Sequence, residues 1–352
     1  MNQIIAKPAE SESIRKRYRD NSCRHLLGTA HYLQTRVMNT LKTQCGHKHL
    51  RLGFTPYISL IGERGRRLTD IAEVLGISRQ ACNQAVKPIE SAGYIARKAD
   101  QTDGRAKTLY LTPAGVKLRS DGTRIVTELD REFAAIVGND AIADTSKTLG
   151  KIYHHLALGP AQERVPRPPE VGMGALLPAL ADYILHRLME LTRDKGHRRL
   201  QLRFGQVLTL IGPSGGRIQQ IATIHDVSKQ AISVIATELE EQGYLQRNPD
   251  PTDARQIVLN FTPRGNQLIA DSVLSVEELE HEFAAIVGQA ALKRMNITLR
   301  QLYLGLQLEP DVFEKHNSSD IGHLAHQLQQ ELGPQGSRAL ARLLLTPSVN
   351  TR

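Results

Sequence analysis

A run of side chains able to hydrogen-bond to nucleic-acid bases follows Ser78 in the segment SRQACNQAVKPIE. Serine is a preferred N-cap residue, so it predicts the start of a helix. At helical spacing, one face of that helix carries Arg79, Gln80, Asn83, Gln84 and Lys87. Arginine, glutamine and asparagine can make paired hydrogen bonds to base edges in the major groove. A solvated helix face is the plainer interpretation, but the elements predicted around this helix favour contact with bases or phosphates.

A second helix of this kind is predicted after Ser228. Its corresponding face carries Lys229, Gln230, Ser233, Val234 and Thr237, and Val234 could contact a thymine methyl group. The opposite faces are apolar, and we expect them to pack on the domain. They consist of Cys82, Ala85, Val86 and Ile89 in the first helix and Ile232, Ile235, Ala236 and Leu239 in the second.

Two extended runs around a polar loop follow the first of these helices, which is the pattern of a β-hairpin. The runs are Tyr94–Lys98 and Thr108–Leu111. At the hairpin tips, Arg105 and Arg255 can enter a minor groove, and Asp103 and Asp253 are expected to support the arginine two residues later. The basic residues expected near phosphates are Arg97, Lys98 and Lys107, with Arg247 in the second segment.

The chain is a duplication with an offset of 150 residues. EFAAIVG stands at Glu132–Gly138 and again at Glu282–Gly288, and the same offset carries Phe54 to Phe204. A period this long indicates two whole domains, because solenoid repeats run about 20–50 residues. The predicted parts are a first domain over residues 11–158, a Pro-rich linker over 159–173, a second domain over 174–308 and a C-terminal helical tail over 309–352.

The elements of one copy come in the order of a winged helix-turn-helix domain. Apolar periodicity predicts long helical segments at Arg24–Lys42, Ile125–Ile136 and Ala141–Leu156, and a short apolar segment at Tyr57–Ile61. Thr69 is expected to cap a short helix at Asp70–Leu75, Pro88 to kink or end the helix after Ser78, and Thr112-Pro113 to open another helix. The predicted fold class is mainly α with small β-hairpin wings: a tandem duplication of a winged helix-turn-helix domain with long flanking helices of a dimerisation type.

With these motifs the sequence resembles the MarR family of bacterial transcriptional regulators. The family pattern is a Ser-capped recognition helix, a Gly-hydrophobic pair with an arginine, Asp-x-Arg in the wing and a Leu-Thr-Pro-like helix start. The matching residues are Ser78, Gly93, Arg97, Asp103 and Arg105 in the first copy and Ser228, Gly243, Arg247, Asp253 and Arg255 in the second. The resemblance implies two lobes held by N- and C-terminal helices on a near-palindromic operator, here supplied by one chain. The turn glycine Gly76 becomes Asp226 in the second copy, which leaves the docking angle open.

The charge of the chain favours a polyanionic partner such as double-stranded DNA, although membrane headgroups would also fit. The formal net charge is +9. Residues 46–120 carry 13 Lys and Arg against 6 Asp and Glu, whereas residues 196–270 carry 8 against 6, so we expect the first copy to bind DNA more strongly. No stretch approaches the roughly 20 apolar residues of a membrane span, and no signal-peptide core begins the sequence. The predicted location is cytoplasmic, at a bacterial nucleoid.

Other chemistry has little support in the residues. Cys82 corresponds to Ile232, which favours packing, and Cys23, near Tyr18 and Tyr32, is the position at which an oxidant could be sensed. His47, His49, His154 and His155 could bind a metal only if the fold gathered them. No phosphate-binding glycine loop or nucleophile elbow occurs. We expect no metal, no cofactor and no enzymatic activity.

Two other functions remain open at this point. In one, a repressor responds to an oxidant or to a small aromatic effector bound between the winged lobe and the helical body, as the resemblance suggests. In the other, only the first copy binds DNA, while the second copy and the tail recruit a protein. The leucines of Leu324–Leu345 motivate the second idea, although packing on the chain's own body is the plainer interpretation. The chain could act as an intramolecular pseudo-dimer or pair into a homodimer.

Overall fold

The computed structural model describes residues 8–62, 65–99, 107–158, 172–212, 215–225, 227–250 and 256–309. Helices make up most of these residues, and each copy adds one small three-stranded sheet. The predicted fold class is therefore confirmed. The hairpin tips, most of the linker, Asp226 and the tail after Glu309 lie outside the described residues.

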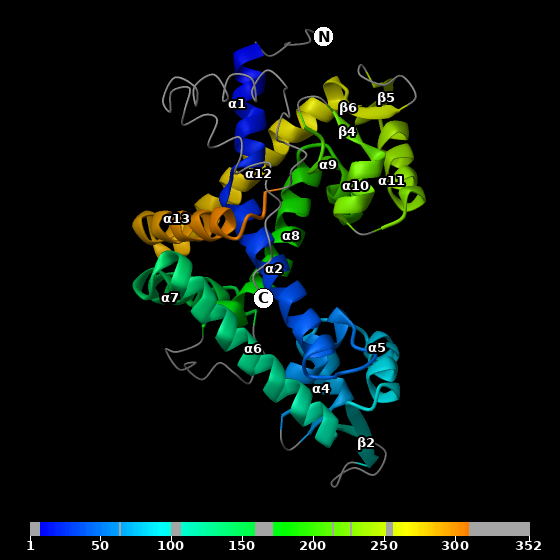
Figure 1. Ribbon diagram of the computed structural model, residues 1–352, viewed down its shortest axis with the longest axis vertical. Helices are drawn as coiled ribbons and strands as arrows, with labels where there is room; N and C mark the ends of the chain where they lie inside the picture. Colours follow the sequence, from blue (N-terminus) through cyan, green and yellow to red (C-terminus); the bar gives the residue numbers. More distant parts are fainter. Residues whose placement is uncertain are drawn as a thin grey trace, which may run out of the picture. The chain divides into compact units, whose positions relative to one another are not determined.

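In the first copy, helices precede and follow a winged lobe (Figure 1). The helices are α1 (Pro8–Arg19), α2 (Ser22–Thr43), α3 (Thr55–Leu60), α4 (Leu68–Val74), α5 (Arg79–Ser91), α6 (Pro113–Val137) and α7 (Asn139–His155), with a 3-10 turn at Leu52–Phe54. The strands are β1 (Arg66–Arg67), β2 (Ile95–Ala99) and β3 (Lys107–Leu111), and β3 lies between the other two.

The second copy repeats this order. Its helices are α8 (Met173–Asp194), α9 (Gly205–Leu208), α10 (Ile218–Ile224), α11 (Lys229–Glu241), α12 (Pro263–Val287) and α13 (Gln289–Gly305), with a 3-10 turn at Leu202–Phe204. Its strands are β4 (Gly216–Arg217), β5 (Leu245–Pro249) and β6 (Ile257–Phe261), with β6 in the middle. The bounds of α11, α12 and α13 are those of α5, α6 and α7 shifted by 150 residues, so the duplication extends to the fold.

Capping side chains explain where the main helices begin. The Ser78 hydroxyl accepts a hydrogen bond from the Ala81 amide (3.1 Å) at the start of α5. Thr112 accepts one from Gly115 (3.1 Å) at the start of α6, where Pro113 occupies the first turn. Thr262 does the same for α12. The sequence predicted helix starts at Ser78 and at Thr112-Pro113, and the structure confirms both.

The predicted cap at Thr69 is wrong, and of the two outcomes expected at Pro88, a kink or an end of the helix, the end is wrong. Thr69 does not cap α4, because the chain passes from β1 directly into a helix that begins at Leu68, and the Thr69 hydroxyl donates to Asp70 (3.0 Å). Pro88 does not end α5, which continues to Ser91. A proline removes one backbone hydrogen bond, but Val86 and Ile89 beside it are fully buried and hold the helix on the lobe.

The described residues form two compact units that do not follow the two copies. The first unit comprises the residues up to Gly205 together with Leu239–Leu245 and Phe261–Glu309. The second comprises Gln206–Glu238 and Gln246–Asn260. The long helices of both copies and the first winged lobe therefore belong to one unit, and most of the second winged lobe forms the other.

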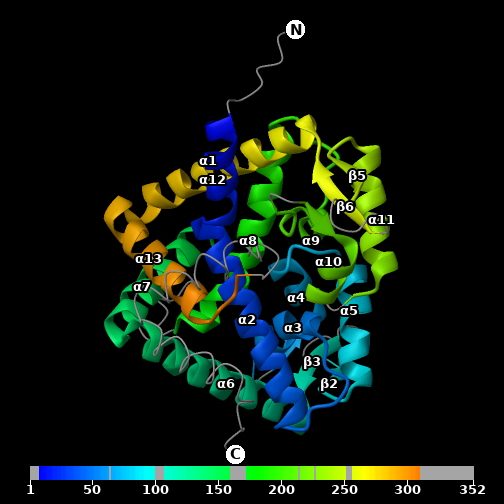
Figure 2. The same ribbon diagram turned by 45° about the horizontal axis from the view of Figure 1, so that its top comes forward.

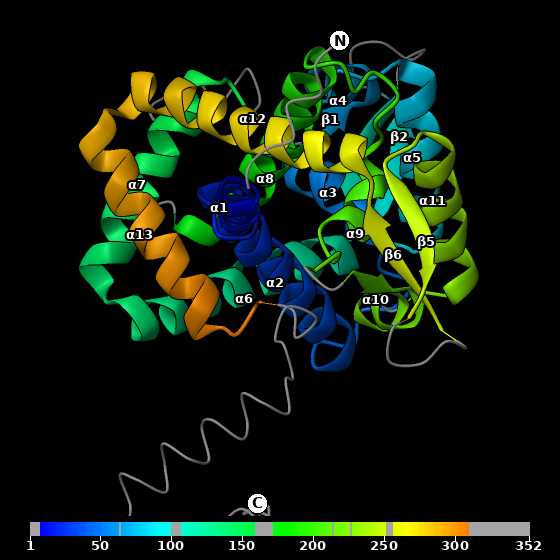
Figure 3. The ribbon, with the colours of Figure 1, turned by 90° about the horizontal axis from the view of Figure 1, so that it is seen from above.

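Helices of the two copies pack crosswise in the first unit. Helix α2 of the first copy packs against α13 of the second, and α8 of the second packs against α7 of the first. Helices α2 and α8 also contact each other, as do α7 and α13 (Figures 2 and 3). Matching positions are buried in the two C-terminal helices: Leu149, Ile152 and Tyr153 in α7, and Leu299, Leu302 and Tyr303 in α13. Each copy thus covers apolar faces of the other.

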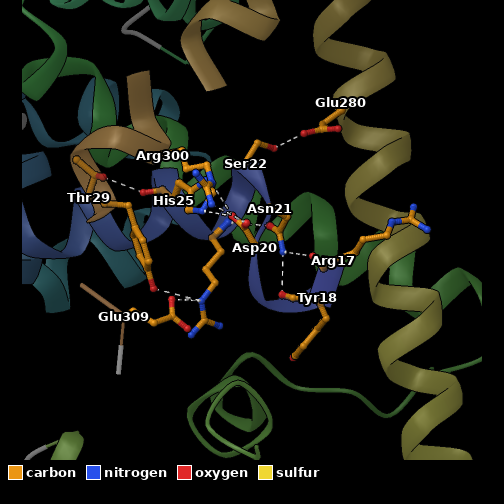
Figure 4. A network of polar contacts seen from close by, with 12 residues as sticks. Arg17, Tyr18, Asp20, Asn21, Ser22, His25, Thr29, Glu280, Arg300 and Glu309 are labelled. Carbon is orange, nitrogen blue, oxygen red and sulfur yellow. Dashed lines mark hydrogen bonds and ion pairs between the residues drawn. The ribbon is translucent and has the colours of Figure 1, made fainter. Parts of the chain in front are cut away.

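A polar network at the junction of α1 and α2 links the N-terminal helices to α12 and α13 (Figure 4). Asp20 accepts two hydrogen bonds from Arg300 (both 3.1 Å) and lies 3.0 Å from His25 Nε2. Ser22 donates to Glu280, and Arg24 Nε donates to the Tyr303 hydroxyl (3.2 Å). The hydrogen bonds from Arg300 lower the pKa of Asp20, although partial burial opposes this. The network connects the first residues of one copy to the last helices of the other.

A cavity of about 680 Å³ opens beside this network. Charged and polar side chains line much of it, among them Asp20, Ser22, Glu277, Glu280, Lys293 and Arg300. It lies among the long helices, whereas the effector hypothesis places the effector between a winged lobe and the helical body. Some of its charged groups already have partners: Asp20 pairs with Arg300, which also lines the cavity, and Glu277 pairs with Arg17.

One buried histidine–aspartate pair occurs in each copy. His47 Nε2 lies 2.9 Å from Asp121 Oδ2, and His197 Nε2 lies 3.0 Å from Asp271 Oδ2. The second ring nitrogen of His197 lies 2.9 Å from the hydroxyl of Tyr244. These pairs tie the segment after α2 or α8 to helix α6 or α12. Among the described residues, no group of three or more His, Cys, Asp or Glu is placed to hold a metal ion.

The carbonyl group of Tyr94, three residues after the end of α5, lies close to the start of α6. This contact predicts that alanine substitutions at two glycines of α6 will change the stability of the protein differently. A Cβ at Gly115 would lie 2.0 Å from the Tyr94 carbonyl oxygen, whereas a Cβ at Gly122 would meet nothing within 4 Å. We expect Gly115→Ala to destabilise the protein by about 1–3 kcal/mol through overpacking against backbone.

Gly122→Ala is the matched control, and it should stabilise the helix by up to about 1 kcal/mol. Urea denaturation followed by circular dichroism measures both. Gly265→Ala should behave like Gly115→Ala, since its Cβ would lie 2.1 Å from the Tyr244 carbonyl oxygen. Equal midpoints for Gly115→Ala and Gly122→Ala would contradict the close contact.

Candidate nucleic-acid interface

Helix α5 has one buried face and one open face. Cys82, Val86 and Ile89 are fully buried against the lobe. The predicted contact residues lie on the open side: Ser78, Arg79, Gln80, Gln84 and Lys87 are exposed, and Asn83 is half-buried. The helix therefore presents a row of hydrogen-bond donors and acceptors, held at a fixed angle by its apolar face.

Arg97 reaches from strand β2 to helix α5. Its Nε donates to Glu90 Oε2 (2.9 Å), and its Nη1 donates to Asn83 Oδ1 (2.7 Å). Its charge is therefore balanced by Glu90 inside the lobe, while the sequence suggested a phosphate contact for it. These charge-assisted hydrogen bonds tie α5 to the hairpin and orient the Asn83 amide, and the phosphate contact stays a prediction.

The other basic residues of the hairpin strands point into solvent. Lys98 is exposed, with its ammonium 5.2 Å from the centre of the Tyr110 ring, and Lys107 on the paired strand is exposed too. Arg105 and Asp103 at the tip lie outside the described residues, as do Arg255 and Asp253 of the second copy. Their roles stay predictions.

Sequence reasoning overlooked strand β1. Its residues Arg66 and Arg67 pair with Leu109 and Thr108 of β3, which places two half-buried arginines along the outer side of the hairpin. A two-residue strand has no readable alternation, so the pattern gave no strand signal. The run RGRR at residues 64–67 was the available hint, because basic clusters favour phosphate contacts.

Helix α11 repeats the geometry of α5 with other side chains. Ser228 caps it through the Ala231 amide (3.1 Å), and its apolar face is buried through Ile232, Ile235, Ala236 and Leu239. Of the predicted contact residues, Ser228, Lys229, Gln230 and Val234 are exposed, and Ser233, Thr237 and Arg247 are half-buried. Arg247 Nη2 donates to the Thr237 hydroxyl (2.9 Å) and the Ser233 carbonyl (3.3 Å), so it also links a hairpin strand to the recognition helix.

Burial disfavours the thiolate form of two of the three cysteines. Burial raises the pKa of the Cys23 thiol to about 12, with a smaller contribution from Glu280. Desolvation also raises the pKa of Cys82, whose sulfur lies 3.7 Å from the Leu68 carbonyl oxygen. Because the thiolate is the reactive form, both thiols are held in the unreactive state.

The winged lobes coincide with matches to a known family. The model of the MarR family matches residues 56–106 and 206–256. The chain is 28% identical over 100 residues to a protein of Thauera aromatica proposed as the transcriptional regulator for the hcr operon, and 26% identical over 78 residues to the HTH-type transcriptional regulator YdcH of Bacillus subtilis (strain 168). These segments cover 28% and 22% of the chain and 60% and 50% of those relatives.

Solved structures give weaker matches. The transcriptional regulator Tm0710 of Thermotoga maritima aligns with 38% of this chain and 92% of its own, at 20% identity and a TM-score of 0.32. CouR of Rhodococcus jostii RHA1, solved with p-coumaroyl-CoA, aligns with 37% of this chain and 90% of its own, at 23% identity and a TM-score of 0.30. Within the described residues, no helix is both long and apolar enough to cross a membrane.

The buried thiols predict a graded reactivity. At pH 8 we expect iodoacetamide to label the half-buried Cys45 first, with Cys23 and Cys82 labelled only after urea unfolds the chain. Mass spectrometry of the peptides measures the order. Rapid labelling or peroxide oxidation of Cys23 in the folded protein would contradict this order and support the oxidant hypothesis.

The two neighbouring basic residues of β2 should behave differently. Arg97→Ala is expected to lower the free energy of unfolding by about 1–2 kcal/mol, because it removes two charge-assisted hydrogen bonds, and also to weaken DNA binding. Lys98→Ala should leave stability within about 0.5 kcal/mol of wild type and reduce the salt slope of duplex binding by about 0.9.

Urea denaturation and fluorescence anisotropy over a salt series separate these effects. Arg97→Lys should not restore stability, since one ammonium cannot reproduce the geometry with which the guanidinium joins Asn83 and Glu90. If Arg97→Ala changed only the salt slope, Arg97 would be a phosphate contact instead.

Proposed function

We propose that this chain, which carries two MarR-family domains in tandem, is a transcriptional regulator that binds a specific double-stranded operator through both of its winged lobes. The observation that carries the proposal is the matched pair of Ser-capped helices, α5 and α11. Each buries an apolar face and exposes side chains suited to a DNA groove, beside a hairpin.

One chain supplies both lobes as a pseudo-dimer. Support comes from the crosswise packing of the long helices, since α2 packs on α13 and α8 on α7 within a single polypeptide. Faces that separate subunits would use to pair are already covered inside the chain. A protein of this kind needs no catalytic group, because its output is the occupancy of a DNA site. It acts on the nucleoid, where that site lies.

DNA contact in this proposal has two parts. Exposed side chains of α5 and α11 meet base edges, and the hairpin residues Lys98, Lys107, Arg105 and Arg255 meet phosphates or a minor groove. Arg97 and Arg247 hold the recognition helices on their hairpins. The greater basic charge of the first copy makes it the stronger contributor to affinity.

Selection of bound fragments from the source genome tests the proposal. At about 0.1–0.2 M salt we expect the wild type to enrich a discrete sequence with two half-sites, and the double variant Arg105→Ala/Arg255→Ala to lose that enrichment. Arg105→Ala alone should weaken binding more than Arg255→Ala, because its lobe carries more of the phosphate attraction.

The complex should contain one chain of 39.1 kDa per operator when its mass is measured by light scattering. Two chains per operator would contradict the pseudo-dimer. Retention of fragments without sequence preference would contradict a specific regulator, and equal losses for the two single variants would contradict the unequal lobes.

A further inference from the structure

The recognition helices α5 and α11 have the same frame and different exposed chemistry. Both run for 13 residues, and both begin with a serine cap at 3.1 Å. Their buried faces are apolar in both copies. The buried residues differ in size but stay apolar, whereas the open face changes in chemical character. There Asn83, Gln84 and Lys87 are replaced by Ser233, Val234 and Thr237, and Arg79 by Lys229. Two helices held alike but built from different groups will select different bases.

Val234 is the most informative of these positions. Its exposed fraction is 54%, and no other large hydrophobic side chain among the described residues is more exposed. Valine is also a poorer helix former than the glutamine at the matching position of α5. Neither core packing nor helix propensity accounts for it. An apolar group in the middle of a DNA-facing surface suits one feature of the major groove, the 5-methyl group of thymine.

On the open face of α11, Val234 is the side chain that projects beyond its neighbours. Ser233 and Thr237 have short side chains, and Arg247 bonds the Thr237 hydroxyl and the Ser233 carbonyl from the hairpin side. In α5 the matching arginine bonds the Asn83 side chain, which keeps a longer polar group at the edge of the open face. The first helix therefore offers amides and charges to a groove, and the second offers a branched apolar side chain.

The two helices also differ in charge, and this difference again favours polar contacts for α5 and apolar contacts for α11. Helix α5 carries Arg79 and Lys87 against Glu90 alone. Helix α11 carries Lys229 against three glutamates near its C-terminal end, which are Glu238, Glu240 and Glu241. Phosphates repel such a cluster, so the second lobe depends less on charge attraction and more on shape and apolar contact.

We infer that the operator consists of two unlike half-sites, and that Val234 reads a thymine methyl group in the second. This inference rests on the proposed function and adds to it. A pseudo-dimer with unlike helices binds its operator in one orientation, so its placement relative to a promoter has a direction that a symmetric dimer on a palindrome lacks. Glutamine and lysine in α5 select polar base edges in the first half-site, and α11 selects thymine.

Replacement of single thymines by deoxyuridine in the selected operator tests this directly, because deoxyuridine lacks only the 5-methyl group. With wild type, one or two replacements in the second half-site should weaken binding about fourfold, the effect of one buried methyl-sized group. Val234→Ala should bind the thymine and deoxyuridine operators equally. Val234 is exposed, so an unchanged urea midpoint is expected to show that the variant is folded.

Gln84→Ala is the matched control from the other helix. It should change base preference in the first half-site and keep the deoxyuridine effect in the second. The quadruple variant Lys229→Arg/Ser233→Asn/Val234→Gln/Thr237→Lys gives α11 the contact residues of the open face of α5, and it should prefer a symmetric operator built from two first half-sites by at least tenfold over wild type.

The outcomes separate this inference from the proposed function. Specific binding to a palindrome, or a second half-site indifferent to deoxyuridine, overturns the inference and leaves a specific regulator. A footprint over one half-site only also overturns it and points to a second lobe that binds protein. Absence of any sequence preference defeats the proposed function itself.

Discussion

The arrangement of this protein depends on the exchange of apolar faces between its two copies. Helices α7 and α13 bury matching residues, such as Leu149 and Leu299, and the long N-terminal helix that covers each of them comes from the other copy. Each buried leucine or isoleucine contributes about 1.5–3 kcal/mol relative to exposure. A single copy would leave these faces in water, so the fused chain is the smallest piece that can bury them without a partner.

Polar contacts between these helices add little to the free energy of folding, and their main effect is to fix how the helices align. Surface ion pairs contribute about 0–1 kcal/mol each, so the pairing of Asp20 with Arg300 is a modest stabiliser. Its geometry is nevertheless specific, because the two hydrogen bonds hold the start of α2 against one turn of α13 (Figure 4). The hydrogen bonds from Arg300 lower the pKa of Asp20, so this contribution is present at neutral pH and is lost as the pH falls through that lowered pKa.

Close contacts with the long helices α6 and α12 also hold the residues that follow α5 and α11. Gly115 and Gly265 admit the carbonyl groups of Tyr94 and Tyr244 against the start of the next long helix. The buried pairs of His47 with Asp121 and of His197 with Asp271 brace the same regions. These constraints repeat in both copies, whereas the exposed positions of α5 and α11 differ. Folding restricts the buried residues in both copies, whereas the exposed residues of α5 and α11 are free to differ without loss of packing.

The sequence by itself determined the duplication, the Ser-capped helices, their apolar faces and the hairpins that follow them. Each of these has a local signal: an offset of 150 residues, a capping side chain, or a period of 3.6 or 2. Local signals gave incorrect expectations where an adjacent strand or the packing of buried side chains decided the structure. Strand β1 leads straight into α4 and displaces the cap expected at Thr69, and burial of Val86 and Ile89 carries α5 past Pro88.

Only the tertiary structure decided which helices cover one another. Periodicity shows that a helix has an apolar face, but α2 and α13, which cover each other, lie far apart in the chain. The role of Arg97 was equally hidden, because its partners Asn83 and Glu90 stand 14 and 7 residues before it on another element. The raised pKa of Cys23 likewise follows from its burial and from the nearby Glu280 of the other copy. In each case the deciding interaction joins residues on different elements, and the periodicity of one element carries no record of such a contact.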